Sequence, residues 1–224
     1  ISGKYKIGTR RFGSINWIGA WTLYKKEVLR FLIVWMQTLF SPLITSLLFL
    51  SVLSLAIGND RGDVLGVPFI VFLAPGLIAM QIIQQAFSHS SSSFMIGKIQ
   101  GNIVDLIYAP LSAGEVTLAV TLASVTRSVL IAAISLLVFY LFIDLEIKNF
   151  ITLISFTLLS AFSLGALGII AGLWAEKFDH MATVTNFIII PLSFLSGTFY
   201  SIERLPEVLQ IISKANPFFY MIDG

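Results

Sequence analysis

Few residues in this chain have the types and spacing that enzyme chemistry requires. The sequence contains two histidines, His89 and His180, and neither lies at a spacing that makes a metal site or a catalytic pair. There is no cysteine, which excludes thiol nucleophiles, thiolate metal ligands and disulfides. The G-x-x-x-x-G-K-[ST] loop that holds nucleotide phosphates is also missing from the sequence. We therefore expect no catalytic residue, no metal site and no cofactor bound by this chain.

Polar side chains inside long apolar runs are better candidates for function. Arg127 lies within the apolar run 116–142. At a rise of ~1.5 Å per residue it would lie ~16 Å deep in a hydrocarbon core of ~30 Å, where an arginine faces a bundle interior or a cavity. It is therefore either a contact for an anionic or polar substrate, or a structural hydrogen-bond hub or snorkelling side chain. Hydroxyl residues share one face of the same run: Thr117, Thr121, Ser124, Ser128 and Ser135.

Amide side chains mark two further apolar runs. Gln81, Gln84 and Gln85 lie in the second half of the run 67–87, where they either line a water-filled path or mark a helix end that leaves the bilayer. Asn186 lies in the last apolar run. The candidates for a substrate path are Arg127, Gln81, Gln84, Thr121 and Asn186. None of the runs contains Asp or Glu, which argues against an ion-coupled carrier, because proton or sodium coupling generally needs intramembrane carboxylates.

The composition places these side chains in a membrane. The chain has 224 residues, of which 57% are hydrophobic and 12% are charged, and its mean hydropathy is +0.92. Soluble domains average ~25% charged residues. A chain this apolar has too few polar side chains to cover its surface in water. The long, uninterrupted apolar runs predict an integral membrane protein built of helices. The net charge of +2, without a basic stripe interleaved with aromatic residues, gives no sign of nucleic-acid binding.

These runs predict an all-α polytopic membrane protein, with residues 1–224 as one transmembrane domain. An interfacial amphipathic helix is predicted at 15–30, with aromatic rings on one side and lysines on another; the alternative is the flank of the first span. A short amphipathic helix at 203–213 should cap the outer face. Five transmembrane helices are predicted between them, at 31–57, 67–87, 116–142, 150–174 and 182–198. Small residues repeat along the fourth of these, which predicts close helix packing: Ser160, Gly165, Gly168 and Gly172.

The segment 94–115 is longer and more polar than a hairpin between two membrane helices needs. Nine lysines and arginines lie in the N-terminal region and in the loops 94–115 and 175–180, against four in the remaining loops. By the positive-inside rule, these loops and the N-terminus are cytoplasmic. We interpret 94–115 as the place where a partner outside the bilayer acts on the spans. A permease with neither a nucleotide site nor an ion relay takes its energy from such a partner.

A set of short motifs lies along the chain in an order that is specific, although each motif alone is weak. They are KE at 26–27, RF at 30–31, WMQTL at 35–39, PGLI at 75–78, SSF at 92–94, KIQGNI at 98–103, AP at 109–110, FD at 178–179, PLSFLSGTFYS at 191–201, LP at 205–206 and NPFFYMI at 216–222. From Trp21 to Gly224 the chain resembles the membrane subunit of an ABC type-2 exporter.

The resemblance implies a permease subunit driven by a separate ATPase, with ATP and Mg²⁺ on that partner. Residues 99–108 would form a coupling helix that docks in a groove of the ATPase, and the loop 176–180 would make a lesser contact. The coupling residues would be Lys98, Gln100, Asn102, Asp105, Leu106, Tyr108, Pro110, Glu115, Glu176, Lys177 and Asp179. Asp105 is alternatively a solvated surface charge, and Ser112-x-x-Glu115 is alternatively a capping box for the third span.

The resemblance also implies a homodimer in the bacterial inner membrane, surrounded by membrane lipid. The substrate path would lie between the first, second and fifth spans, with the helix at 203–213 as an outer gate. The family has six spans, whereas this sequence, which stops at Gly224, holds five; the sixth is expected to begin shortly after. The cargo would be a lipid, glycolipid, polysaccharide or drug-like molecule. Two other hypotheses stay open: a nucleotide-independent channel or lipid scramblase gated at Pro42, Pro75 and Pro191, and a non-transporting assembly subunit.

Overall fold

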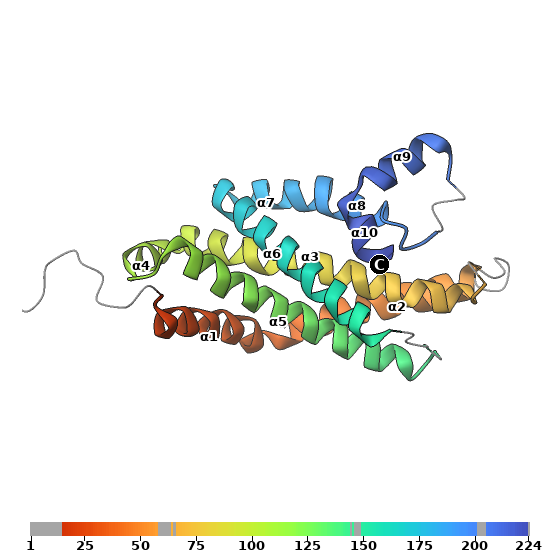
Figure 1. Cartoon of the computed structure of the whole chain (residues 1–224), viewed down its shortest axis with the longest axis horizontal. Helices are drawn as coiled ribbons and strands as arrows, with labels where there is room; N and C mark the ends of the chain where they lie inside the picture. Colours follow the sequence, from red (N-terminus) through yellow and green to blue (C-terminus); the bar gives the residue numbers. More distant parts are fainter. Residues whose placement is uncertain are drawn as a thin grey trace, which may run out of the picture.

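The structure is a computed structural model, and it describes residues 15–57, 64, 66–143, 145, 149–200 and 205–223. Within these residues the chain is helical, apart from turns and one isolated bridge between Val64 and Val67. The prediction of an all-helical fold is confirmed. The elements (Figure 1) are α1 (Trp17–Ile33), the π-helix η1 (Met36–Phe40), α2 (Ser41–Ile57), α3 (Phe69–Ile99), α4 (Ile103–Tyr108), α5 (Ala113–Tyr140), α6 (Phe150–Trp174), α7 (Phe178–Val184), the π-helix η2 (Thr185–Ile189), α8 (Ile190–Phe194), α9 (Glu207–Ala215) and α10 (Pro217–Asp223).

Four helical segments in the described part of the chain are long and apolar enough to cross a membrane. They are Met36–Ala56, Phe69–Ile99, Ala113–Tyr140 and Phe150–Trp174, and they correspond to the first four predicted spans. The fifth span, predicted at 182–198, falls in a continuous run of three short helices, α7, η2 and α8, of seven, five and five residues. This run is not among the four, so a fifth crossing stays a prediction.

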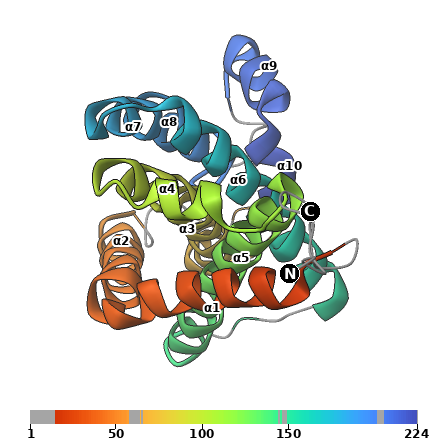
Figure 2. The same ribbon diagram turned by 90° about the vertical axis from the view of Figure 1, so that its left-hand side faces the viewer.

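The central helix of the bundle is α3, which packs against both α5 and α6, with α2 and α1 further out (Figures 1 and 2). It is 31 residues long, or ~46 Å at ~1.5 Å per residue, and so exceeds a hydrocarbon core of ~30 Å by several turns. The second span was predicted to end at residue 87, but α3 continues to Ile99. The reason is that Ser90 and Ser91 are buried against neighbouring helices rather than left in solvent.

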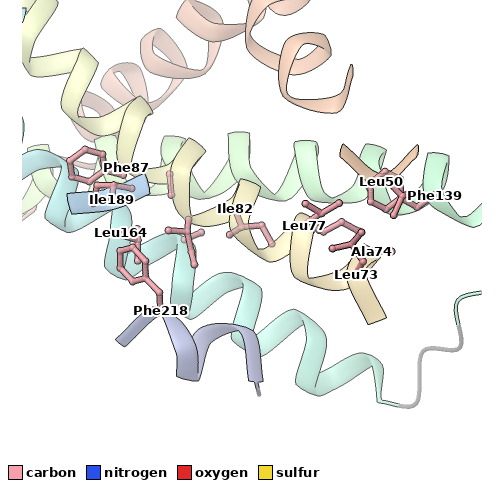
Figure 3. Packing of buried hydrophobic residues seen from close by; sticks show 14 of the residues in the cluster. Leu50, Leu73, Ala74, Leu77, Ile82, Phe87, Phe139, Leu164, Ile189 and Phe218 are labelled. Atoms are coloured by element: carbon pink, nitrogen blue, oxygen red, sulfur yellow. The ribbon is translucent and has the colours of Figure 1, made fainter. Parts of the chain in front are cut away.

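Apolar side chains from several elements meet along α3 (Figure 3). Leu73, Leu77 and Ile82 of α3 belong to one buried cluster with Phe139 of α5, Leu164 of α6, Ile189 of η2 and Phe218 of α10. Lipid tails are as apolar as these side chains, so inside a bilayer the cluster stabilises the fold by dispersion and close fit rather than by removal from water. The cluster joins both halves of the described chain into one bundle.

Helix α6 approaches α3 and α5 closely because its facing residues are small. A Cβ added to Gly168 would lie 2.5 Å from the carbonyl oxygen of Phe87, and one added to Gly172 would lie 2.7 Å from that of Ser91. A Cβ on Gly165 would collide with the Ser124 hydroxyl of α5 in the same way. The prediction of close packing along this face is confirmed.

Both π-helical segments directly precede a turn that contains proline. Pro42 follows η1, and Pro191 follows η2. Proline has no N–H to donate, and its ring displaces the carbonyl four residues earlier, so the preceding turn widens into a π-bulge to find other partners. Pro75 lies within α3, which nevertheless continues past it.

Helix α1 lies across one end of the bundle and rests on α5 (Figure 2). Its own residues Leu23, Glu27 and Phe31 form the buried face, whereas Trp17 and Trp21 are 73% and 58% exposed. The helix ends at Ile33, and η1 begins at Met36. Its position in the lipid headgroup layer stays a prediction.

Near the C-terminus, α9 stands apart from the body of the bundle and α10 returns to it (Figure 1). Phe218 of α10 is 2% exposed within the core. Asn216, between the two helices, donates from Nδ2 to the carbonyl oxygen of Leu192 at 2.7 Å. The described part of the predicted outer helix, 203–213, corresponds to α9.

Candidate functional site

Helix α4 lies at one tip of the bundle, where the chain passes from α3 to α5 (Figure 1). Gly101 has a φ of +75°, a conformation that glycine adopts at little cost and that ends α3. The extended backbone at Ala109 then turns the chain back toward α5. The coupling helix predicted at 99–108 is therefore shorter than expected, because Gly101 interrupts it.

The two faces of α4 differ in burial. Its inner face, Ile103 and Leu106, packs against a small cluster that includes Leu23 of α1 and Phe94 of α3. Its outer face consists of Val104, Asp105, Ile107 and Tyr108; all four side chains are exposed, with Ile107 73% and Tyr108 84% exposed. Of the predicted coupling residues, Leu106 thus points inward and Asp105 and Tyr108 lie on the surface.

The Lys98 side chain ties the end of α3 to the end of α6. Its Nζ donates to the carbonyl oxygens of Leu173 and Ala175, the latter at 3.0 Å. These carbonyls belong to the last turn of α6 and its cap, where a cation is favoured by both hydrogen bonding and the helix dipole. Gln100 and Asn102 are exposed, and the Asn102 amide donates to Gln100 Oε1 at 3.2 Å.

The Glu115 carboxylate holds the start of α5 and the start of α1 together. It accepts a hydrogen bond from the backbone N–H of Ser112 at 2.7 Å, and the Ser112 hydroxyl accepts one from Glu115 N–H at 3.3 Å. This is the predicted capping box, which the structure confirms. Glu115 Oε1 also accepts from the backbone N–H of Asn16 at 2.5 Å. With a side chain only 6% exposed, Glu115 lies inside the chain rather than on the outer face of α4.

Asn16 forms the second half of this junction. Its side-chain oxygen caps α1 by accepting from Gly19 N–H at 3.0 Å, and its Nδ2 donates to the carbonyl oxygen of Pro110 at 3.1 Å. One residue thus joins the N-terminus of α1 to the segment between α4 and α5. We refer to the contacts among Asn16, Pro110 and Glu115 as the α1 junction.

The second predicted contact loop lies at the same end of the bundle, because Ala175 is bound by Lys98 of α3. Glu176, Lys177 and Asp179 are all exposed. The backbone N–H of Glu176 donates to His180 Nδ1 at 3.4 Å. Exposed charges of both signs therefore lie on the same end as α4.

The substrate-path candidates lie on three different elements: Gln81 and Gln84 on α3, Thr121 and Arg127 on α5, and Asn186 on η2. Arg127 Nη2 donates to Gln85 Oε1 at 2.6 Å, and the arginine is 9% exposed. Gln81 accepts from the Ser135 hydroxyl at 3.0 Å. These contacts join α3 to α5, and a role of Arg127 in substrate contact stays a prediction. The other candidates are scattered: Thr121 is buried beside Gly165 of α6, Gln84 is half-buried, and Asn186 is exposed on η2.

An ion pair within α1, whose arginine is hydrogen-bonded to α3, was not foreseen from the sequence. Glu27 is 2% exposed; its Oε2 lies 2.9 Å from Arg30 Nε and 3.8 Å from His89 Nε2. Arg30 also donates from Nη2 to the carbonyl oxygen of His89 at 3.0 Å. The available signal was that Glu27 lies three residues before Arg30, a spacing at which opposite charges pair on a helix. In the described residues, no three or more metal-ligating side chains gather into a site.

Comparison with known proteins assigns the chain to a family. Residues 19–224 match the ABC-2 type transporter family. The chain is 31% identical to the inner membrane transport permease YadH of Escherichia coli K12 over 210 residues, which cover 94% of this chain and 82% of YadH. It is 25% identical to nodulation protein J of Rhizobium leguminosarum bv. trifolii over 218 residues, covering 94% of this chain and 80% of that protein.

No solved structure matches the chain. The family match nevertheless spans nearly all of α1 through α10, and it agrees with the four long apolar helices. This chain belongs to the ABC-2 type transporter family and is a multi-pass membrane transport protein.

Proposed function

We propose that this chain is the permease subunit of an ATP-driven exporter in the bacterial inner membrane. A separate ATPase, which holds ATP and Mg²⁺, binds the end of the bundle where α4 lies. That end faces the cytoplasm, because the segments on its side carry most of the lysines and arginines outside the spans. The relatives named transport permease and nodulation protein support transport but name no substrate.

The observation that carries the proposal is the outer face of α4. Three of its four side chains, Val104, Ile107 and Tyr108, are apolar or aromatic and largely exposed, although they lie beyond the ends of the long helices. Exposed apolar residues outside a bilayer mark a surface that a partner covers. A short helix that packs one face against its own bundle and exposes the other can bind in a groove of another protein. Asp105 beside them can pair with a basic side chain of the partner.

The α1 junction lets a displacement of α4 reach three helices. Helix α4 is joined by short segments to α3 and α5, and Asn16 links Pro110 and Glu115 to α1. The capping box and the hydrogen bonds of Lys98 stiffen this end of the bundle. A movement of the ATPase against α4 would therefore displace α1, α3 and α5 together. Such a joint displacement is how ATP hydrolysis could open the substrate path.

In the complete transporter, this chain also pairs with a second copy of itself. Only 17% of the apolar window of Met36–Ala56 is buried within one chain, so this span is free to face lipid or a second copy. We place the substrate path between two copies, near the first, second and fifth spans, where Asn186 is exposed. Helix α9 would then cover its outer mouth.

The test is a double substitution on the outer face of α4, Ile107→Ser with Tyr108→Ala, in the chain reconstituted with its ATPase. Loss of apolar anchors that contribute about 1–3 kcal/mol should weaken ATPase binding ~10-fold or more, and substrate-dependent hydrolysis should fall with it. Val208→Ser on α9 is the matched control, because Val208 is 69% exposed. Unchanged ATPase binding in the double variant would refute the proposed docking surface.

A further inference from the structure

A row of polar side chains lies where α3 packs against α5. Gln81, Gln85 and His89 follow one another at intervals of four residues, so they share one side of α3. Gln81 accepts a hydrogen bond from Ser135 of α5, and Gln85 accepts one from Arg127. His89, the next in the row, is 0% exposed, and neither of its ring nitrogens has a hydrogen-bond partner among the described residues.

Two neighbouring side chains of α5 also have polar atoms without partners. The Nε of Arg127 and the hydroxyl of Ser128 are buried and form no hydrogen bond within the described part of the chain. Ser128 precedes Ser135 by two helical turns, so it shares the side of α5 that faces α3. Arg127 interacts electrostatically with His89. Since buried polar groups are nearly always hydrogen-bonded, these atoms point to a ligand that the chain itself does not supply.

This region of the bundle carries a net positive charge. Arg30 of α1 and Arg127 of α5 lie near enough to repel each other, and an arginine keeps its proton in proteins. The single carboxylate beside them is Glu27, whose Oε2 lies 2.9 Å from Arg30 Nε. Among the described residues, Arg127 has no ion-pair partner of its own. Two arginines against one glutamate leave one positive charge without a counter-charge.

The membrane spans provide no carboxylate for this charge. Glu115 is the only acidic residue in the four membrane-span candidates. It lies ~18 Å from Arg127 along α5, at ~1.5 Å per residue, and it binds the backbone N–H groups of Asn16 and Ser112. A second copy of the chain has the same spans and brings no other acid in them. Water could satisfy the hydrogen bonds, but it would leave the buried charge, which costs far more than an unpaired neutral group.

The ligand that fits is a small anion. Arg127 Nε–H, the Ser128 hydroxyl and one ring nitrogen of His89 all donate hydrogen bonds, and a halide ion accepts them from any direction. His89 and Ser128 are 0% exposed and Arg127 is 9% exposed, which leaves no room for a phospholipid headgroup. We propose that a monovalent anion of the size of chloride binds between α3 and α5 at Arg127, His89 and Ser128. This site neutralises Arg127 within the bundle and does not depend on the proposed function.

The first experiment measures whether chloride stabilises the fold. The melting temperature of the purified full chain in detergent is followed while sodium chloride replaces sodium gluconate at constant ionic strength. A ligand that binds only the folded chain raises the melting temperature, so we expect a rise that saturates with chloride. Bromide should act in the same way. Equal melting temperatures in chloride and gluconate, or a rise that never saturates, would overturn the proposal.

The second experiment locates the site by substitution. Arg127→Gln removes the charge and should abolish the effect of chloride, whereas Ser128→Ala removes one donor and should weaken chloride binding severalfold. Ser155→Ala on α6 is the matched control, because the Ser155 hydroxyl is exposed and bonds only to the Ile151 carbonyl of its own helix. It should leave the effect unchanged. If Arg127→Gln does not fold, Ser128→Ala decides. A chloride effect that Ser128→Ala leaves unchanged would place the ion elsewhere and refute the site.

The third experiment counts the ion and tests the charge argument. Equilibrium dialysis with radioactive chloride should show a single bound ion per unchanged chain, a measurement that needs no variant; no bound chloride would reject the proposal. Glu27→Gln leaves both arginines without a carboxylate, so it should bind chloride severalfold more tightly. Weaker binding by a folded Glu27→Gln chain would contradict the role of the net charge.

Discussion

Glu27 is almost fully buried, although it lies in a helix that exposes two tryptophans on its other side. Its carboxylate pairs with Arg30, and Arg30 donates to the backbone of α3 at His89. Removing one partner of a buried ion pair costs about 3–5 kcal/mol, a figure reduced here because the Arg30 side chain is 28% exposed. The pair holds the Arg30 guanidinium in place, and its hydrogen bond to the His89 carbonyl oxygen then fixes how α1 is rotated on the bundle. Arg127 with Gln85 and Lys98 with the end of α6 hold other helices in the same way.

At this scale, Asn16 provides a test of how force reaches α1. Asn16→Ser keeps an oxygen that can cap α1 but loses the Nδ2 donor to Pro110. We expect thermal stability within about 0.5 kcal/mol of the unchanged chain and a reduced ratio of transport to ATP hydrolysis. Asn16→Ala should lower both, because it also loses the cap, by about 1 kcal/mol. A transport ratio for Asn16→Ser equal to that of the unchanged chain would show that the bond from Asn16 Nδ2 to Pro110 transmits nothing.

At the scale of elements, the distance between α3 and α6 is set by glycine. Gly168 and Gly172 bring α6 against backbone carbonyls of α3. Without a hydrophobic driving force between helices inside a bilayer, such close contact is a main source of helix association. The same contact buries Ser90 and Ser91 and allows α3 to continue beyond the predicted end of its span. The position of α4 at the tip of the bundle depends on this continuation.

Gly168→Ala should therefore force α3 and α6 apart. The added Cβ would lie 2.5 Å from the Phe87 carbonyl oxygen, and overpacking of this kind costs about 1–3 kcal/mol. Gly114→Ala is the control, because Gly114 lies in the first turn of α5 with nothing within 4 Å of its added Cβ. Thermal unfolding of the purified chain in detergent measures both. An equal melting temperature for the two variants would contradict the close-packing assignment.

At the scale of the whole molecule, the two ends of the bundle differ in chemistry. One end carries α4, the α1 junction and exposed charges of both signs. The other carries the beginning of α3 and the stacked rings of Phe194 and Phe199. In the proposed orientation, the ATPase acts on the cytoplasmic end, and the substrate leaves at the outer end. The length of α3 connects the two.

This orientation can be measured directly because the chain has no cysteine. Tyr108→Cys on α4 and Val208→Cys on α9 each introduce one reactive thiol at an exposed position. In intact cells, a membrane-impermeant maleimide should label Val208→Cys but not Tyr108→Cys. After permeabilisation it should label both. Labelling of Tyr108→Cys in intact cells would place α4 on the wrong side of the membrane and contradict the proposed docking of an ATPase.

The sequence by itself determined the helical class, the membrane setting, the places of four helices long enough to be the first four spans, and the capping box at Ser112 and Glu115. These properties are local: an apolar run of sufficient length forms a helix in a bilayer whatever its neighbours, and a capping box spans only four residues. The family resemblance rested on the order of short motifs, and the family match agrees with it.

Only the tertiary structure decided which partners the polar side chains take. Lys98, a predicted ATPase contact, caps α6, and Leu106 packs inward. The burial of Glu27 follows from the packing of α1 against the rest of the bundle. The pocket lined by Phe49, Phe69 and Phe194 likewise combines α2, α3 and α8, which are far apart in the sequence. A side chain's type sets what it can bind, but burial and distance, which depend on long-range packing, select the partner.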